Sequence, residues 1–195
     1  VANPHTMWSE IDPSLPAVKI EVLGPPPTSG TRDAFVELVM DVGCEEVAAV
    51  EALDSDRRKQ VCRTLREDGA FIEAGENDVL IVRKLEANPD AFGIFGFSFL
   101  DQNSDVVQGS RVEGAGATFD NVANGAYPVS RPLFFYAKTA HADLVPGFRE
   151  FIREFTDERT WGEDGYLIDR GLIPMPDDER SRYRDDARSL SNNLM

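Results

Sequence analysis

Hydrophobic and polar positions alternate along parts of this chain in the way that half-buried β-strands require. Residues 18–22 read Val-Lys-Ile-Glu-Val, an alternation typical of a strand. Residues 91–100 alternate glycine with aromatic side chains, which predicts a second strand with a close backbone neighbour. A third apolar run at residues 133–137 predicts another strand, for which Pro128 and Pro132 favour a sheet edge or a crossing between domains.

Apolar residues recur at helical spacing in the segments between and after these strands. One helix is expected to begin at Ser29, after a proline-rich loop, and a second at Asn77 or Asp78. Three further helices are predicted over residues 118–124, 145–155 and 176–190. In residues 145–155 the phenylalanines indicate a side that faces the core. In residues 176–190 the mixed charges indicate a helix side that faces water.

Strands and helices that follow one another in this order are typical of an α/β fold. We therefore expect a lobe with a mixed β-sheet flanked by helices. The 195 residues are enough to bury a core in one domain or in two small ones. No tandem repeat or low-complexity tract is present in the sequence.

The charge balance of the chain excludes two classes of partner. The sequence has 35 acidic and 20 basic residues, a formal charge of −15 at pH 7. Such a charge repels nucleic acids and anionic lipid surfaces, so neither is expected as a partner. A small anionic ligand is still compatible, because the net charge is spread over the surface and screened within about 8–10 Å at physiological salt.

Apolar runs such as residues 132–137 are far shorter than the roughly 20 residues of a membrane-spanning helix, so no membrane insertion is expected. The sequence begins with valine and shows no charged-then-apolar leader. A processed product and an excised fragment are both compatible with this beginning.

Residue types that carry out catalysis or bind metals lack the spacing that these roles need. His5 and His141 have no zinc-ligand spacing with other residues, so neither a metal nor a cofactor is expected. Residues 113–118 are glycine-rich but lack the Gly-Lys-Ser/Thr ending of a phosphate loop. Glu76 and Asp78 form a carboxylate pair at a helix start, where acidic residues are favoured in any case. We expect a protein that is not an enzyme.

The triplet Ser29-Gly30-Thr31 stands at the expected start of a helix and permits two interpretations. Hydroxyl oxygens accept hydrogen bonds from the first free N–H groups of a helix, which makes the triplet an N-cap. The same N–H groups and the positive end of the helix dipole also suit a phosphate or sulfate. From these residues alone the cap is the favoured interpretation.

The two cysteines, Cys44 and Cys62, lie 18 positions apart. Two buried free thiols and one disulfide are both compatible with the residues between them. A disulfide would imply an oxidising compartment such as the bacterial periplasm.

Four stretches together carry a set of motifs: a strand leading to Ser-Gly-Thr, a Gly-x-Asn-Asp step into a helix, an alternating glycine and aromatic strand, and a Tyr-Pro-Val-Ser-Arg-Pro strand. Taken in this order, they resemble the later portion of the phosphate-binding components of bacterial phosphate ABC transporters, which are periplasmic binding proteins. The stretches are residues 8–31, 62–103, 118–138 and 161–180.

The resemblance implies a periplasmic monomer of two α/β lobes that closes on one phosphate. Strands crossing between the lobes are implied near residues 18–23 and 127–137. The Ser-Gly-Thr motif lies near mid-chain in the family but begins at position 29 here. Residues 1–195 therefore resemble the later portion of such a protein, with most of the first lobe missing. That lobe supplies further phosphate contacts in the family, including a carboxylate that no residue here matches.

The resemblance also implies phosphate contacts, residue by residue. Ser29, Gly30 and Thr31 match the motif whose hydroxyls and backbone N–H groups hold phosphate oxygens. Pro25 stands where many members have an arginine. Arg66 matches an arginine that substitutes for it in the branch with a proline-rich loop.

Arginine offers a planar, bidentate fork to a phosphate, which supports the prediction for Arg66. The alternative for Arg66 is a surface ion pair with Glu67 or Asp68. Arg63 and Arg32 are further candidates, ranked below Arg66.

Asn77 and Asp78 match the helix-start pair of the family, where structural capping and closure contacts are both implied. The resemblance favours a disulfide between Cys44 and Cys62. It implies that the protein presents inorganic phosphate to ABC transporter permease subunits. Three alternatives stay open: a binding protein for another oxyanion such as sulfate or molybdate, a phosphate-handling enzyme, and a sensor or matrix protein that reuses the fold.

Overall fold

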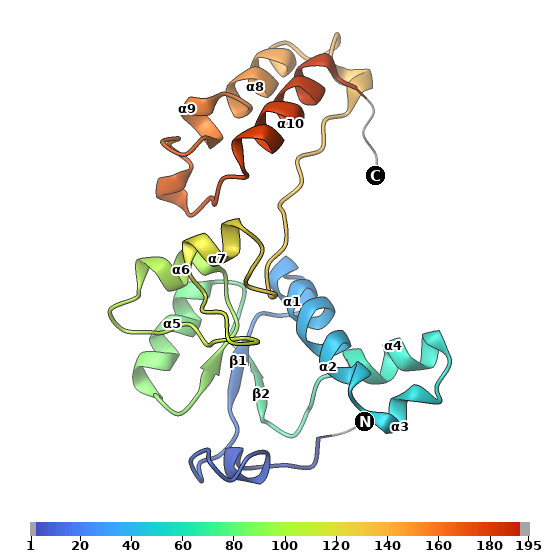
Figure 1. Cartoon of the computed structure of the whole chain (residues 1–195), viewed down its shortest axis with the longest axis vertical. Helices are drawn as coiled ribbons and strands as arrows, with labels where there is room; N and C mark the ends of the chain where they lie inside the picture. Colours follow the sequence, from blue (N-terminus) through green and yellow to red (C-terminus); the bar gives the residue numbers. More distant parts are fainter. Residues whose placement is uncertain (1–2, 192–195) are drawn as a thin grey trace. The chain divides into compact units, whose positions relative to one another are not determined.

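The computed structural model describes residues 3–191 and divides the chain into two units (Figure 1). Unit 1 consists of Val1–Gly114 with Pro128–Ser130, and unit 2 of Ala115–Tyr127 with Arg131–Met195. The last passage from unit 1 to unit 2 lies between Ser130 and Arg131. None of the helices within residues 3–191 has the length and apolar character needed to cross a bilayer.

Unit 1 contains a three-stranded parallel sheet in the order β2-β1-β3. The strands are β1 (Val22–Gly24), β2 (Phe71–Glu73) and β3 (Phe92–Gly93). The α/β class is confirmed, but these strands are parallel rather than mixed. An isolated antiparallel bridge between Met7 and Lys19 lies outside the named strands.

Each strand of the sheet is followed by a helix. After β1 comes α1 (Gly30–Phe35), after β2 comes α5 (Asp78–Ala87), and after β3 comes α6 (Phe97–Gln102). In Figure 1, α1 and α5 flank β1 on two sides. The core forms where α5 packs on the sheet, because Ile81 is fully buried beside Leu23.

Four further helices of unit 1 are grouped around the disulfide: the π-helical turn η2 (Val36–Met40), α2 (Asp41–Glu45), α3 (Ala48–Glu51) and α4 (Ser55–Arg63). The short helix η1 (Trp8–Glu10) lies elsewhere, with the ring of Trp8 against that of Phe92 in β3. Cys44 of α2 and Cys62 of α4 are joined in a disulfide, with their Cα atoms 5.7 Å apart. In the chain-entropy description, a loop of this length makes a disulfide worth about 3 kcal/mol.

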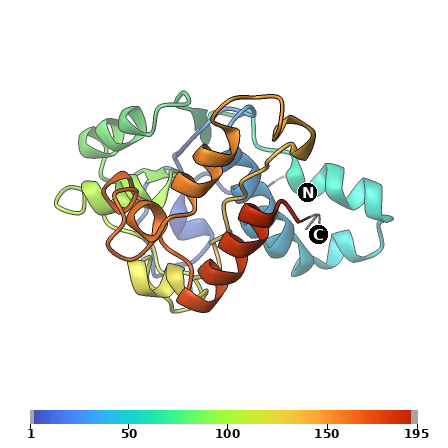
Figure 2. The ribbon, with the colours of Figure 1, turned by 90° about the horizontal axis from the view of Figure 1, so that it is seen from above.

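Unit 2 is helical in the part that the structure describes. Its helices are α7 (Phe119–Ala123), η3 (Thr139–His141), α8 (Phe148–Phe155), α9 (Glu158–Trp161), η4 (Ile168–Arg170) and α10 (Asp177–Ser189). Helices α8 and α10 lie side by side in both views of the ribbon (Figures 1 and 2). The guanidinium of Arg188 joins them by donating to the carbonyls of Arg153 and Thr156, each at 3.2 Å.

The three predicted strands differ from the structure. The strand expected over residues 18–22 overlaps the observed β1 (Val22–Gly24) only at Val22. The strand expected over residues 91–100 is wrong beyond Gly93, because Gly96 is the N-cap of helix α6. The strand expected at residues 133–137 is also wrong, because the structure assigns no secondary structure to residues 131–138. A single extended segment becomes a strand only when another strand pairs with it.

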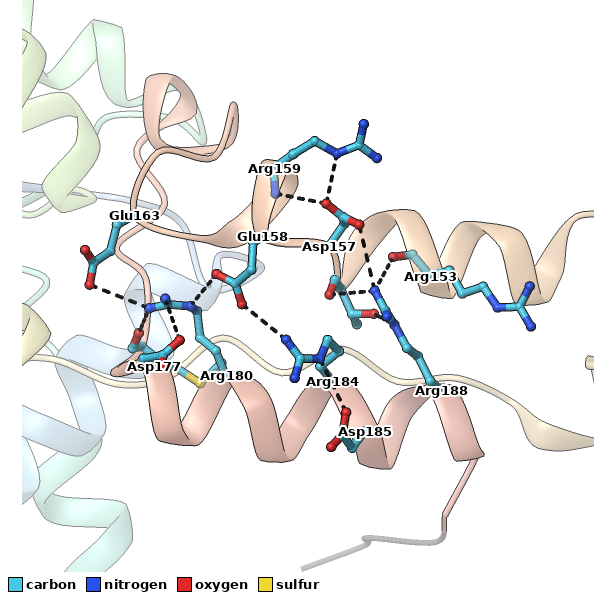
Figure 3. A network of polar contacts seen from close by, with 12 residues as sticks. Arg153, Asp157, Glu158, Arg159, Glu163, Asp177, Arg180, Arg184, Asp185 and Arg188 are labelled. Atoms are coloured by element: carbon cyan, nitrogen blue, oxygen red, sulfur yellow. Dashed lines mark hydrogen bonds and ion pairs between the residues drawn. The ribbon is translucent and has the colours of Figure 1, made fainter.

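The side chains of two predicted helices are also placed differently from the expectation. In α8, Ile152 is buried as predicted, but Phe151 is 59% exposed. In α10, the charged side chains do not all form a solvated face, because Arg180 is buried. Figure 3 shows that the guanidinium of Arg180 points toward carboxylates of α9 and of the segment that follows it.

Candidate functional site

The loops that follow the three strands of unit 1 meet at one edge of the sheet. All three strands are parallel, so their carboxyl ends lie at the same edge. The loops are residues 25–29, 74–77 and 94–96, and each leads into a helix start. This edge of an open α/β sheet is where ligands are generally bound, since helix N-termini present free N–H groups there.

The Ser29-Gly30-Thr31 triplet starts helix α1, as predicted. Ser29 is the N-cap in an extended conformation, and its Oγ accepts a hydrogen bond from the backbone N–H of Thr31 at 3.2 Å. Helix α1 continues without interruption through η2 and α2, to Glu45. The cap is therefore what these atoms form in this structure, and the triplet lies at the carboxyl edge of the sheet.

Two side-chain contacts join the three loops of this edge. The hydroxyl of Thr28 donates a hydrogen bond to Oε1 of Glu76, which connects the first loop to the second. Oδ2 of Asp78 accepts a hydrogen bond from the N–H of Gly96 at 3.2 Å, which connects the second loop to the third. Hydrogen bonds therefore join the loop before α1 to that before α5, and the start of α5 to that of α6.

Asn77 and Asp78 have different partners at the start of α5. Oδ1 of Asn77 accepts from the N–H of Val79 at 3.0 Å, so Asn77 is the N-cap of the two candidates that the sequence offers. Asp78 faces the loop before α6 through Gly96. The structure thus brings Asn77 and Asp78 to the same sheet edge as the Ser-Gly-Thr triplet.

Arg32 lies in the first turns of α1, directly behind this edge. Its Nη1 donates to the carbonyl of Pro25 at 3.0 Å, and its guanidinium carbon lies 4.7 Å from the centre of the Phe71 ring. Partial burial lowers the pKa of the Arg32 guanidinium, and the nearby Glu73 carboxylate opposes this effect. Sequence reasoning ranked Arg32 below Arg66, but the proximity of Arg32 to the triplet in the chain was a signal in its favour.

Arg66 lies at the opposite edge of the sheet, ahead of the amino end of β2. Its guanidinium pairs with Asp68 and donates to the carbonyl of His5 at 2.7 Å. Asp68 in turn accepts from the N–H of Ala70 at 3.2 Å, just before β2 begins. The structure therefore shows the ion-pair alternative for Arg66 and does not bring it to the Ser-Gly-Thr edge. Arg63 forms an ion pair with Asp41 at 2.6 Å.

Most of the chain matches a known protein family. The family described as the PBP superfamily domain matches residues 2–159. The chain belongs to the PBP superfamily. The match covers the parallel sheet, the three helix starts and the disulfide.

Several proteins with known names resemble this PBP-superfamily chain. It is 27% identical to the phosphate-binding protein PstS of Staphylococcus haemolyticus, over 94% of this chain and 49% of that protein. It is 23% identical to the protein SphX of Synechococcus elongatus, over 88% of this chain and 44% of that protein. The chain spans about half the length of the curated relatives that it matches.

A solved structure shares the fold. It is the crystal structure of a possible phosphate binding protein from Planctomyces limnophilus, which superposes with a TM-score of 0.63 over 97% of this chain and 60% of that chain. The identity of 22% makes this a likeness of fold alone. In the described residues of this PBP-superfamily chain, no three His, Cys, Asp or Glu side chains are placed to hold a metal ion together.

The carboxyl of Asp78 should make the stability of unit 1 depend on pH. Partial burial raises its pKa, and the hydrogen bond from Gly96 opposes this effect. Well below the ordinary pKa of aspartate the carboxyl is protonated in both the folded and the unfolded state, so its burial costs little. As the pH rises through the ordinary and then the raised pKa, the folded state must ionise a half-buried group, and unit 1 loses stability. We expect Asp78→Asn to remove this loss, as measured by urea unfolding between about pH 4 and 7.

Asp68→Asn is the matched variant, and its effect on the free energy of unfolding should have the opposite sign. The pKa of Asp68 is lowered, chiefly by its hydrogen bond with Arg66. Its contribution to stability is therefore present above the ordinary pKa of aspartate and lost in acid. Asp68→Asn should lower stability at neutral pH, whereas Asp78→Asn should raise it. Equal pH profiles for Asp78→Asn and the unchanged chain would contradict the assignment to Asp78.

Proposed function

We propose that this chain binds inorganic phosphate non-covalently at the carboxyl edge of the unit 1 sheet. One observation carries the proposal: three helix starts meet at this edge, and one of them bears Ser29-Gly30-Thr31. A helix start offers N–H donors and a positive dipole end to an anion. The names of two similar proteins support phosphate as the oxyanion: the phosphate-binding protein PstS of S. haemolyticus and the possible phosphate binding protein of P. limnophilus.

The proposed role is that of the extracytoplasmic solute-binding component of an ABC phosphate importer. In this role the protein is a monomer in the periplasm that presents phosphate to permease subunits and performs no covalent chemistry. The disulfide between Cys44 and Cys62 supports an oxidising compartment. The similarity to proteins named phosphate-binding protein PstS supports the transport role.

The binding groups follow from the edge geometry. Backbone N–H groups of Gly30 and Thr31, together with the hydroxyls of Ser29 and Thr31, are the proposed donors to the phosphate oxygens. Arg32 would supply positive charge from behind the edge, where Pro25 holds its guanidinium. Asn77 and Asp78 are proposed to contribute at the start of α5.

Calorimetric titration of phosphate into the chain tests this function. We expect Thr31→Val to weaken phosphate binding about tenfold or more, because one hydrogen bond to a charged group is worth about 1.5–3 kcal/mol. Thr64→Val serves as the control, since the Thr64 hydroxyl donates to the carbonyl of Gln60 in α4, away from the edge. Binding that is equal in both variants would contradict the site.

The same titration shows which candidate arginine contributes to binding and which anion binds more tightly. Arg32→Ala should weaken binding because Arg32 stands behind the triplet, and Arg66→Ala tests the role that the family resemblance implies for Arg66. Sulfate replaces phosphate in a parallel titration. Tighter binding of sulfate would favour a transporter component for another oxyanion, and no heat with either anion would contradict oxyanion binding by this chain.

A further inference from the structure

The ring of Phe71 in β2 contacts both the sheet and the start of helix α1. Phe71 pairs with Val22 of β1 in the parallel register. Alternate residues of a strand face the same side of a sheet, so Gly24 lies on the side to which Phe71 points. A Cβ atom placed on Gly24 would lie 2.5 Å from Cζ of Phe71, which is too close for any side chain. Glycine at this position therefore makes room for the ring.

The same ring carries the guanidinium of Arg32. The guanidinium carbon lies 4.7 Å from the centre of the Phe71 ring, within the range of a cation–π contact. Nη1 of Arg32 donates to the carbonyl of Pro25 at 3.0 Å. Pro25 is fully buried and its ring fixes φ, so this carbonyl is held in place. The two contacts together fix the orientation of the guanidinium before any ligand binds.

The remaining donors of Arg32 are available to an anion. In residues 3–191 the only hydrogen bond of this side chain is that to Pro25, so Nε and Nη2 have no acceptor there. The Glu73 carboxylate is near enough to raise the pKa of Arg32, but the two side chains form no ion pair. Arg32 also follows Thr31 directly in the chain. A guanidinium offers a planar pair of donors to a phosphate, which suits Nε and Nη2 to this role.

We propose that Phe71 is a positioning residue of the phosphate site, whose ring holds the Arg32 guanidinium with Nε and Nη2 turned to the anion. This inference rests on the proposed function. Phe71 itself does not touch the phosphate. Its contribution is that a flexible side chain already held in its bound orientation loses less freedom when the ligand binds.

Phosphate titration of a set of double variants tests this role. We expect Phe71→Leu to weaken phosphate binding about three- to tenfold, because Arg32 must then be ordered during binding. In an Arg32→Gln background the same change should have no further effect, since no guanidinium is left to hold. Phe71→Tyr keeps the aromatic ring and should keep the affinity. Equal losses from Phe71→Leu with and without Arg32 would overturn the proposal.

Phe92→Leu is the matched control. Phe92 of β3 pairs with the same residue, Val22, from the other side of β1, and its ring packs on Trp8 rather than on Arg32. The substitution is the same and lies at the same level of the sheet, so it should leave phosphate binding unchanged. A loss as large as that of Phe71→Leu would show that packing of the sheet is responsible, and would overturn the proposal.

The NMR signal of the Arg32 Nε–H group gives a readout that needs no phosphate. An aromatic ring shifts the resonances of protons near it, and the signal is assigned by its loss in Arg32→Gln. Phe71→Leu should move this signal, and so should Gly24→Ala, whose added methyl group displaces the ring. Phe71→Tyr should leave it in place. A signal that does not move in Phe71→Leu would overturn the proposal.

The two measurements distinguish failure of this role from failure of the proposed function. No heat with phosphate in the unchanged chain would contradict the proposed function, and the role of Phe71 with it. Phosphate binding that is unaffected by Phe71→Leu would contradict the role of Phe71 alone and leave the proposed function standing.

Discussion

Replacing Ile81 with alanine is expected to lower the free energy of unfolding of unit 1 by about 2–5 kcal/mol. Ile81 of α5 is fully buried and packs with Leu23 of β1 and with Ala74, which follows β2. The sheet has only short strands, so much of its stability must come from this contact with α5. Removing the side chain leaves a cavity between the helix and the sheet.

The two tryptophans allow each unit to be followed separately. Trp8 lies in unit 1, with its ring 5.0 Å from that of Phe92, and Trp161 lies in unit 2. In a Trp161→Phe background, the fluorescence of Trp8 during urea unfolding reports on unit 1. Leu80→Ala is the control on the same helix, because Leu80 is 46% exposed and should cost less than about 1 kcal/mol. Equal losses for Ile81→Ala and Leu80→Ala would show that α5 does not anchor the sheet.

Ile81→Ala should also affect the proposed phosphate site, because that site includes the start of α5. Asp78 holds the loop before α6 through Gly96, and this contact depends on α5 staying against the sheet. Local opening of a weakly packed helix costs less free energy than global unfolding. We therefore expect the variant to bind phosphate less tightly even under conditions where the chain stays folded.

Local chemistry explains which parts of the fold the sequence predicts correctly. Ser29 is confirmed as an N-cap, and of the two candidates Asn77 and Asp78 the cap is Asn77. The helix expected from Thr118 also forms, with Thr118 as its N-cap, and each of these three caps accepts a hydrogen bond from a backbone N–H within three residues. A cap depends only on its neighbours in the chain, so sequence reasoning can identify it. Helix starts were accordingly the most reliable predictions.

Strand assignment failed where the outcome depends on distant residues. In residues 91–100 the glycine and aromatic pattern suggested one long strand, but Gly96 is held by Asp78, 18 residues earlier in the chain, and starts a helix. Residues 133–137 have strand composition, but within residues 3–191 no strand pairs with them. Neither outcome can be read from a local pattern, because a strand requires a partner elsewhere.

The sequence predicts the local features of the candidate site but not how its loops come together. The sequence indicates a hydroxyl-bearing helix start at Ser29, but not that the loops at Glu76 and Gly96 meet it. That meeting depends on β1 lying between β2 and β3 in a parallel sheet. Arg66 was ranked first by resemblance, and the structure instead places Arg32 near the triplet, because Pro25 and Phe71 hold its guanidinium.

Arg180 of α10 has a partner far away in the sequence that the charge pattern of the helix does not indicate. The spacing of charges in α10 suggests pairs within the helix, exposed to water. Arg180 is instead buried, and its Nε donates to Glu158 of α9 at 3.1 Å, across 22 residues of sequence (Figure 3). Its Nη1 donates to the carbonyl of Met175. This arrangement fastens the start of α10 to α9.

Removing the carboxylate of Glu158 is therefore expected to destabilise unit 2 by about 3 kcal/mol, because it leaves the buried guanidinium of Arg180 without its nearest counter-charge. Asp177 contacts the same guanidinium at 3.3 Å, but its side chain is 82% exposed. Asp177→Ala should consequently cost less than about 1 kcal/mol, as exposed ion pairs usually do. Trp161 lies in α9, so its fluorescence in a Trp8→Phe background follows the unfolding of this unit.

A double variant distinguishes the loss of the Glu158–Arg180 ion pair from the cost of leaving the Arg180 charge buried and unpaired. If the cost of Glu158→Ala arises from an unpaired buried cation, then adding Arg180→Met removes that cation and fills its place with an apolar side chain of similar length. The double variant should then be more stable than Glu158→Ala alone. A double variant that is less stable than Glu158→Ala would show that Arg180 contributes mainly through its bond to the Met175 carbonyl and its packing, and that its charge is adequately balanced by Asp177 and Glu163.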